Sequence, residues 1–452
     1  MISGSLVSPF AVLITWSIMK KQKTLFLVSL VFLISLFPCA KSIETFSAAT
    51  NSLMAGTAKV NITPRTPIPM SGYGGRNDPF KGIHDELFAR VIVLSDGKNK
   101  VALISVDLIG ISNTFWKDVT DVLEKKAGIR REFVLLSAVH NHNGPGINVY
   151  EENNAPEVLA YIEELKEKII AATKDAMNKM VPVNIGVGKG ECKMNINRRA
   201  QNGKGEITLG MNPYGPCDHE VGVIRVDDKS GKPISVIMNW PCHGVVLGPK
   251  NYMITGDWRG AASAYVEKSL GESVISPLTI GASGDINPLY GPHIDFESNN
   301  SYAFGKDAIG EDLGKESLRV AKEVKTFSTA RINALQRVIS LPTKETDKDP
   351  RKVLQPNSTE NDSLRVRLSV VKIGNIILTG VSGEVFNEIS VKMRKQSPYA
   401  FTFMITHCNG SSGYLVTDDA YAEGGYEVNS TKAKSGAEKA IIENLLAMIN
   451  EL

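Results

Sequence analysis

Hydrophobic residues along the 452-residue chain gather in two alternating kinds of segment. Short apolar runs bounded by turn residues are typical of buried strands, and longer segments with apolar positions three and four apart are typical of amphipathic helices. The short runs predict strands at residues 90–94, 101–106, 133–139, 221–226, 234–239, 277–280 and 375–379. The longer segments predict helices at residues 116–126, 158–180, 261–270, 313–327, 385–395 and 433–448.

This alternation of strands and helices predicts an α/β fold, with a mixed or largely parallel sheet and helices on both of its faces. We expect a single domain over residues 55–452, preceded by a polar leader at residues 41–54. Residues 341–363 are rich in Lys, Asp, Asn, Pro and Thr, which indicates an exposed loop.

The first forty residues have the pattern of a secretory signal. Lys20, Lys21 and Lys23 precede an apolar stretch at residues 24–37, which is too short to span a bilayer comfortably. A signal carries its basic residues near its start, so Met19 is a candidate for the natural first residue. We therefore expect an extracytoplasmic protein, secreted or periplasmic, with an N-terminal membrane anchor as the alternative.

Charge and cysteine content narrow the class of protein further. The chain has 51 basic and 48 acidic residues, and the three lysines of the signal account for the difference. Without a basic run, nucleic acid is not expected as a partner. Export permits disulfides, but the four cysteines beyond the signal allow three pairings that the sequence does not distinguish.

Two histidines follow the apolar run that ends at Val139, just before a Gly-Pro-Gly turn. Side chains two apart in a strand point to the same side, so His140 and His142 are expected to share a face. Two imidazoles at a strand exit suggest a metal ligand with a neighbouring acid/base. A solvated turn that happens to hold two histidines is the alternative.

Four further apolar runs lead to an ionisable residue. These residues are Asp107, His243, Asp285 and Glu384. Sites in open α/β sheets lie outside the carboxyl ends of the strands, so parallel neighbours would bring all four together with His140. Strand order does not follow from one sequence, and the convergence is therefore conditional on these strands being neighbours.

Zinc is the metal that these residue types favour. It binds imidazole nitrogen and carboxylate oxygen, and its catalytic sites leave one position for water. His140, His142 and His243 are the best imidazole candidates, and Glu384 follows a strand and a Ser-Gly turn. Taken alone, His243 is equally compatible with a hydrogen-bonded core histidine, and Glu384 with a carboxylate in the first turn of a helix.

The chain also resembles a known family, the neutral/alkaline (non-lysosomal) ceramidases, through most of the sequence beyond the signal. Two blocks carry the resemblance together: His-x-His-x-Gly-Pro-Gly at residues 140–146 and a tyrosine-rich block at residues 413–427. Supporting segments are residues 55–64, 70–74, 82–84, 105–107, 195–198, 239–243, 256–257 and 383–384.

The resemblance implies one zinc per chain and assigns roles to residues. The implied zinc ligands are His140, His243, Glu384 and Tyr414, and the implied catalytic residues are His142, Arg198 and Tyr426, with Arg199 as an alternative match for Arg198. If His243 and Tyr414 hold one ion, Cys242 and Cys408 lie near each other, either as a disulfide or as two free thiols.

Two departures from the family pattern bear on the substrate. The family has a Gly-Asp-x-Ser-Pro motif at the substrate site. This chain keeps the aspartate of the motif as Asp285 but has Asn287 in place of the serine. Asn287 can hydrogen-bond a substrate but is not a nucleophile, which puts ceramide itself in question. The family's C-terminal immunoglobulin-like domain is not expected here.

These observations together predict a zinc-dependent amidase that hydrolyses an N-acyl amide bond, ceramide-like by resemblance. The expected partner is a small-molecule or lipid amide, with contact to a membrane surface. Two alternatives stay open: an amidase or esterase on a different acylated small molecule, and a non-catalytic secreted binding protein with a degenerate site.

Overall fold

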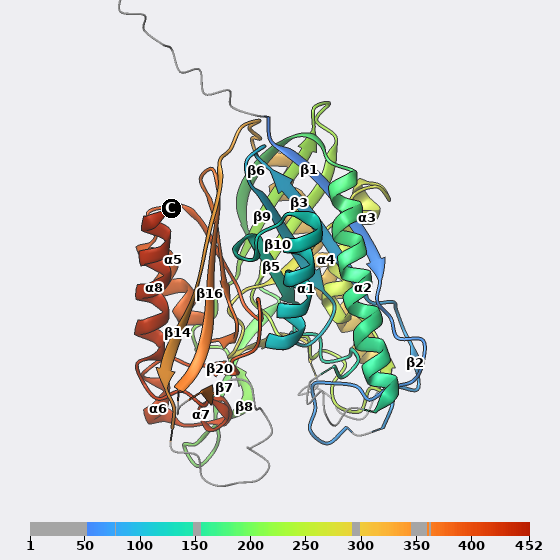
Figure 1. Ribbon diagram of the computed structural model, residues 1–452. Coiled ribbons are helices and arrows are strands. Elements are labelled where there is room, and N and C mark those ends of the chain that lie inside the picture. Colours follow the sequence, from blue (N-terminus) through green and yellow to red (C-terminus); the bar gives the residue numbers. More distant parts are fainter. Residues whose placement is uncertain (1–51, 77, 148–154, 292–298, 345–358, 361–362) are drawn as a thin grey trace, which may run out of the picture. The chain divides into compact units, whose positions relative to one another are not determined.

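The largest sheet has eight strands in the order β12-β10-β9-β6-β1-β3-β4-β5 (Figure 1). Only the pairs β10·β12 and β4·β5 within this sheet are parallel, so of the two expected alternatives the sheet is mixed. Its strands are β1 (Met54–Asn61), β3 (Phe88–Ser95), β4 (Lys100–Val106), β5 (Val134–Ala138), β6 (Val181–Glu191), β9 (Glu220–Asp228), β10 (Pro233–Trp240) and β12 (Leu278–Ile280).

The computed structural model describes residues 52–76, 78–147, 155–291, 299–344, 359–360 and 363–452. The expected signal at residues 1–40 and most of the expected leader and loop lie outside these residues, so those expectations stay predictions. Within the described ranges, no helix combines the length and the apolar character needed to cross a membrane.

A second sheet of five strands packs beside the first. It contains β14 (Ile332–Pro342), β15 (Thr359–Glu360), β16 (Ser363–Ile373), β17 (Ile376–Val381) and β19 (Phe401–Ile405). The two sheets approach closely where Gly222 of β9 meets Phe403 of β19, because a Cβ on Gly222 would lie 2.5 Å from the Phe403 ring. Residues of both sheets contribute to one apolar core, which stabilises their packing.

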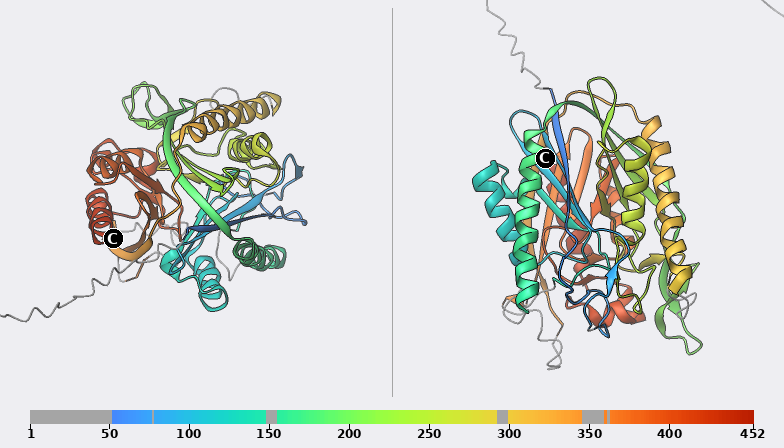
Figure 2. Two further views of the ribbon diagram at one scale, coloured as in Figure 1. Left: turned by 90° about the horizontal axis from the view of Figure 1, so that it is seen from above. Right: turned by 90° about the vertical axis from the view of Figure 1, so that its right-hand side faces the viewer.

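Helices cover the outer faces of both sheets (Figure 2). Helix α2 (Pro156–Asn178) lies over β1 and β3 with α1 (Asn113–Ala127) packed beside it, and α4 (Asn299–Glu323) lies over β6 and β9 with α3 (Asp257–Leu270) packed beside it. Helices α5 (Asn387–Gln396) and α8 (Ala437–Glu451) lie over the second sheet. All six helices and seven strands that the sequence predicts are present, with boundaries shifted by up to about a turn, except at the N-terminus of α4.

Short elements complete the end of the fold that carries the candidate site. They are β2 (Gly82–Ile83), β7 (Asn195–Gln201), β8 (Ile207–Asn212), β11 (Met253–Ile254), β13 (Ile286–Pro288), β18 (Glu384–Val385), β20 (Tyr414–Leu415), α6 (Ala420–Glu423) and α7 (Tyr426–Ser430). The short helix η1 (Arg131–Phe133) instead precedes β5, at the other end of that strand. Strand β7 pairs with β8 and β13, and Figure 1 shows β7, β8, β20 and α7 gathered at one end.

Glycines allow two helices to lie directly on the large sheet. A Cβ on Gly186 of β6 would lie 2.4 Å from Cγ1 of Val324, just beyond α4. A Cβ on Gly56 of β1 would lie 2.0 Å from the carbonyl oxygen of Ala176 in α2. Glycine inside a strand often marks such a close approach, and here it sets the distance between helix and sheet.

We predict that Gly56→Ala destabilises the fold by about 1–3 kcal/mol, because the new methyl group collides with backbone that cannot move independently. Urea unfolding followed by circular dichroism measures this change. Gly75→Ala is the matched control, since a Cβ at the exposed Gly75 meets no atom within 4 Å. Equal midpoints for the two variants would contradict the prediction.

Candidate metal centre

Backbone pairing brings the predicted ligands together from distant parts of the chain. Asn141, next to His140, forms a parallel bridge with Gly244, next to His243. Glu384 of β18 and Tyr414 of β20 are direct partners in a two-residue parallel pair. The loops that follow β5, β10 and β17 therefore meet at one end of the sheets.

Three of the predicted ligand atoms surround a common point. Nε2 of His140 lies 3.1 Å from Nε2 of His243, and Oε2 of Glu384 lies 3.5 Å from each of these nitrogens. A tetrahedral zinc with bonds of about 2.0–2.1 Å separates its ligand atoms by about 3.3–3.4 Å. Oε2 of Glu384 is buried without a hydrogen-bond partner. The donor set and its spacing therefore fit a zinc ion.

The charge state of these residues suits a metal. Burial lowers the pKa of His140 to about 3 and holds the pKa of His142 and His243 well below their usual range, so all three rings are neutral. Burial alone would raise the pKa of Glu384, but the nearby His140, His407 and Arg198 side chains hold it below its usual value. The site therefore presents neutral imidazoles and one carboxylate, the protonation states that metal binding requires.

Carbonyl groups orient two of the imidazoles. Nδ1 of His140 donates to the carbonyl oxygen of Ile109 at 2.9 Å, and Nδ1 of His243 donates to that of Ser283 at 2.7 Å. These bonds place the proton on Nδ1 and leave the Nε2 lone pair facing the centre. Metal-ligating histidines almost always have such a second partner.

His142 lies at the same centre but is held differently. Its Nε2 is 3.1 Å from Nε2 of His140, and its buried Nδ1 has no hydrogen-bond partner. Gly72 presses against the ring, where a Cβ would lie 2.6 Å from Nδ1, and Arg76 donates to the His142 carbonyl oxygen. His142 is therefore within ligand distance but lacks the carbonyl partner that His140 and His243 have.

His140 and His142 lie close together as expected, but they do not share the face of a strand. Strand β5 ends at Ala138, and His140 adopts a left-handed conformation with φ of 58°. Strand alternation therefore does not apply to His140 and His142. The turn itself brings the two rings together, edge to face with centroids 4.7 Å apart.

Arg198 joins the predicted ligands to the predicted substrate residues. Its Nη2 donates to the Tyr414 hydroxyl at 3.0 Å, and its Nη1 lies 3.0 Å from Nε2 of His243. Its Nε donates to Glu427 at 2.7 Å, a buried partner that the sequence did not reveal. Arg199, the alternative match, instead pairs with Glu427 and Glu423, so Arg198 is the arginine that reaches the centre.

The remaining predicted site residues lie around this arginine. Oδ1 of Asn287 accepts from Nη1 of Arg198 at 3.4 Å. Tyr426 is half exposed, and its ring meets that of Tyr414 edge-on at a centroid distance of 5.8 Å. Both residues are therefore close to the candidate centre, and their roles toward a substrate stay predictions.

Asp285 lies beneath the site rather than open to it. Its two carboxylate oxygens accept from the backbone N–H of Asn387 at 2.8 Å and from Nδ2 of Asn197 at 3.1 Å. Burial raises the pKa of Asp285 to about 7. In this arrangement Asp285 fixes the loop that carries Asn287, and a direct contact with substrate remains a prediction.

One expectation from the sequence is wrong, and one open alternative is decided. Asp107 does not join the centre, because its carboxylate forms a buried ion pair with Arg90 at 3.2 Å and accepts from the backbone N–H of Phe88. Cys242 and Cys408 form no disulfide: both are buried free thiols that belong to different apolar cores. The alternative of two free thiols is the one found.

His407 is a member of the centre that sequence reasoning missed. Its ring stacks on that of His140 with centroids 4.0 Å apart, and its buried Nε2 has no hydrogen-bond partner. The signal was present, because His407 follows the apolar strand β19 just as His140 follows β5. The same strand-exit rule would have found it.

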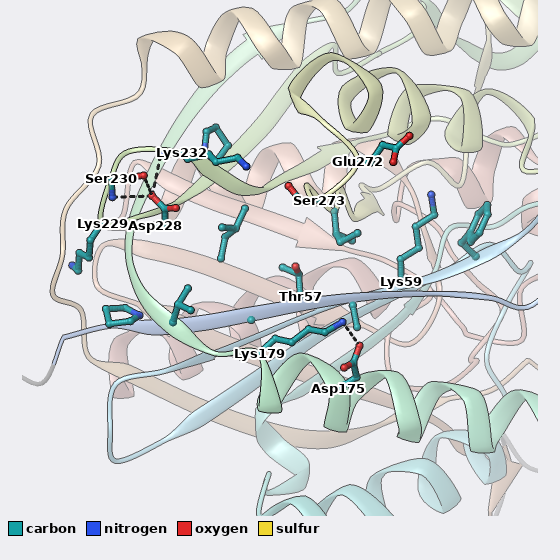
Figure 3. A pocket seen from close by; sticks show the side chains of 18 residues that line it. Thr57, Lys59, Asp175, Lys179, Asp228, Lys229, Ser230, Lys232, Glu272 and Ser273 are labelled. Atoms are coloured by element: carbon teal, nitrogen blue, oxygen red, sulfur yellow. Dashed lines mark hydrogen bonds and ion pairs between the residues drawn. The ribbon is translucent and has the colours of Figure 1, made fainter.

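A separate cavity of about 1040 Å³ lies between β1, the β9–β10 turn and the loop after α3 (Figure 3). None of the predicted site residues lines it. Its charged groups are largely paired with protein, as Lys59 is with Glu267 and Lys179 is with Asp175. The candidate metal centre therefore lies away from this cavity.

Comparison with known proteins identifies the family. Residues 53–303 match the family model described as neutral/alkaline non-lysosomal ceramidase, N-terminal. The chain belongs to the neutral/alkaline non-lysosomal ceramidase family. The match includes the ligand candidates His140 and His243 and ends before Glu384 and Tyr414.

Named relatives agree with this assignment. Neutral ceramidase A of Dictyostelium discoideum is 29% identical over 230 residues, which cover 48% of this chain and 32% of that protein. Neutral ceramidase of Oryza sativa subsp. japonica is 26% identical over 225 residues, which cover 47% of this chain and 28% of that protein. The chain thus covers about a third of the length of these relatives.

Solved structures share the fold over a longer stretch. The neutral ceramidase from Pseudomonas aeruginosa matches with a TM-score of 0.73 and 18% sequence identity, covering 88% of this chain and 74% of that one. A ceramidase complexed with C2 matches equally well, with a TM-score of 0.73 and 17% identity. At this level of identity the likeness establishes the mixed α/β fold and not the activity.

We predict that His243→Ala abolishes stoichiometric zinc binding, because it removes one of the three atoms that surround the common point. Metal content after dialysis, measured by mass spectrometry, tests this. His84→Ala is the matched control and should keep its metal, because His84 is exposed and is not among the clustered donors. Full zinc occupancy in His243→Ala would contradict the ligand assignment.

Proposed function

We propose that this protein is a zinc-dependent amidase that hydrolyses the N-acyl amide bond of a ceramide-like lipid. The observation that carries the proposal is the convergence of Nε2 of His140, Nε2 of His243 and Oε2 of Glu384 within 3.1–3.5 Å of one another. Family membership supports the reaction class, since the named relatives are ceramidases.

His140, His243, Glu384 and Tyr414 would hold the zinc. Bound there, it would acidify a water ligand and polarise the amide carbonyl. The Tyr414 hydroxyl is kept protonated, because burial holds its pKa well above the usual value. It interacts with the Glu384 carboxylate and accepts from Arg198, so the tyrosine joins the centre through both neighbours.

His142 is the best placed general acid/base. Its neutral ring faces the same point as the ligand nitrogens, and nothing among the described residues occupies its Nδ1. It would take a proton from the attacking water at Nε2 and return it to the leaving amine. Arg198 and Tyr426 would donate hydrogen bonds to the oxyanion that develops on the carbonyl oxygen.

A second function keeps the reaction type and changes the substrate. Asn287 stands where the resembled family has serine, and its side-chain oxygen contacts Arg198. It is larger than serine and offers two donors where a hydroxyl offers one. This residue favours an acylated small molecule other than ceramide, cleaved as an amide or an ester. A degenerate binding protein is disfavoured, because all four ligand positions carry ligating side chains.

The setting we propose is extracytoplasmic, at a lipid surface. Strand β8 exposes Leu209 and Met211 on one face, and Tyr214 beyond it is 96% exposed. The hairpin of β7 and β8 also contacts α7, which begins at Tyr426. Replacement of Leu209 and Met211 by serine should weaken co-sedimentation with phospholipid vesicles, and unchanged binding would count against the lipid surface.

The test of the proposed function is a substrate panel on the purified protein with measured zinc. Hydrolysis of ceramides, short N-acyl amides and acyl esters should require zinc and favour an amide. Activity that survives complete removal of zinc would overturn the metal mechanism. A zinc-loaded protein that cleaves none of the panel would favour the binding protein instead.

We predict that His142→Ala keeps its zinc and lowers kcat by about 10²–10⁴-fold, the usual contribution of general acid–base catalysis. Metal content and steady-state kinetics are measured on the same preparation, with His84→Ala as the control. Loss of zinc together with activity would instead make His142 a ligand.

We predict that Asn287→Ser shifts substrate preference toward ceramide. The smaller side chain opens space beside Arg198 and restores the hydroxyl of the resembled family. A buried polar group left unpaired costs roughly 1–3 kcal/mol, so the change can alter discrimination by about tenfold or more. The readout is kcat/KM for ceramide divided by that for a short N-acyl amide. An unchanged ratio, or a wild-type protein that already hydrolyses ceramide efficiently, would contradict the proposed role of Asn287 in substrate preference.

A further inference from the structure

We propose that His407 is a positioning residue, which fixes the ring plane of the ligand His140 by stacking on it and does not ligate the same ion. The inference rests on the proposed metal centre and concerns a residue that neither the motifs nor the family resemblance assigned. His407 lies on the loop between β19 and β20 and is buried.

At first sight His407 resembles a ligand. Donor atoms of His140, Glu384 and His407 all lie within 4.8 Å of one another, as do those of His140, His142 and His243. Proximity alone therefore allows two ligand sets that share His140. The orientation of the rings decides between them.

Stacking prevents His140 and His407 from holding one ion. The lone pair of an imidazole nitrogen lies in the plane of its ring, so a bound metal lies close to that plane. The two rings are stacked with centroids 4.0 Å apart and planes inclined by 16°. An ion bound to Nε2 of His140 lies about 2.0–2.1 Å from that atom, in the plane of the His140 ring. The distance from this ion to the plane of the His407 ring is longer than a zinc–nitrogen bond, so the same ion does not bind His407.

Neither of the other two histidines stacks on His140. His142 and His243 meet the His140 ring edge-on, with interplanar angles of 86° and 81°. The hydrogen bond from Nδ1 of His140 to Ile109 anchors one edge of the ring but does not stop it from tilting. The stacked ring of His407 supplies that restraint.

The backbone of His407 holds the stacked ring in place. Its N–H donates to the carbonyl oxygen of Gly383 at 3.2 Å, and its carbonyl oxygen accepts from the N–H of Ala138 at 3.2 Å. These bonds connect the residue before Glu384 to the end of β5, which leads to His140. His407 keeps a left-handed φ of 49°, an uncommon conformation that persists where the surroundings determine it.

The test compares three replacements of His407. His407→Phe keeps an aromatic face and removes both nitrogens, and His407→Asn tolerates the left-handed backbone without an aromatic face. His407→Ala removes the side chain beyond Cβ. Zinc dissociation constants come from competition with a chromophoric chelator, and thermal unfolding of each apo variant reports on folding.

We expect His407→Phe to bind zinc within about threefold of wild type, and His407→Asn and His407→Ala to bind about 10–100-fold more weakly, the usual cost of losing an outer-shell partner. Every variant should still bind one zinc per chain. Because Nε2 of His407 has no partner, phenylalanine removes no hydrogen bond made by that atom.

Two results would overturn the inference. Equal weakening in His407→Phe and His407→Ala would assign the effect to the nitrogen, and wild-type affinity in His407→Asn and His407→Ala would remove the role altogether. A wild type that binds no zinc would refute the metal centre and this inference together. Zinc binding without amidase activity would refute only the proposed reaction.

Discussion

One constraint determines how this end of the molecule is organised. The buried carboxylate of Glu384 faces neutral imidazoles, and the point that these side chains surround holds no counter-charge from the described residues. Glu384 is ionised, its Oε2 has no hydrogen-bond partner, and burial keeps His140 and His243 uncharged. A buried carboxylate oxygen without a hydrogen-bond partner is costly, whereas a divalent cation at this point would satisfy that oxygen and both nitrogens. The loops must therefore be held together by forces that do not depend on these side chains.

Backbone pairing holds the loops of the candidate centre together, and it places some of their residues in strained backbone conformations. Among the described residues, left-handed non-glycine conformations occur at four positions: His140, His407 and Asn409 in loops at the centre, and Asp257 at the start of α3. Asn409 shows how such a turn is held, since its side-chain oxygen accepts from the N–H of Leu136 in β5. Strain of this kind persists where surrounding hydrogen bonds over-determine the conformation, and it clusters at functional sites.

The seven strands that the sequence predicts are present, and in two of the strands that it missed, close contact or polarity hides the pattern. Strand β6 was missed because its alternating glycines, which let α4 approach, look like a loop. Strand β7 was missed because its polar side chains, Arg198 among them, face the site. The strand-exit rule found His140, yet it also selected Asp107. The rule locates the end of a strand, but it does not tell whether the residue there is already paired with a cation, as Asp107 is with Arg90.

Arg198 ties the metal side of the site to the substrate side. One guanidinium contacts Tyr414, His243 and Asn287, and the buried Glu427 balances its charge. An arginine fork holds its donors in fixed relative positions, so a shift at one partner moves the others. Asn287 contacts a cation that also contacts the proposed zinc ligands His243 and Tyr414. We therefore expect a departure from the resembled family's pattern at this one residue to act on substrate choice and on metal binding through the same group.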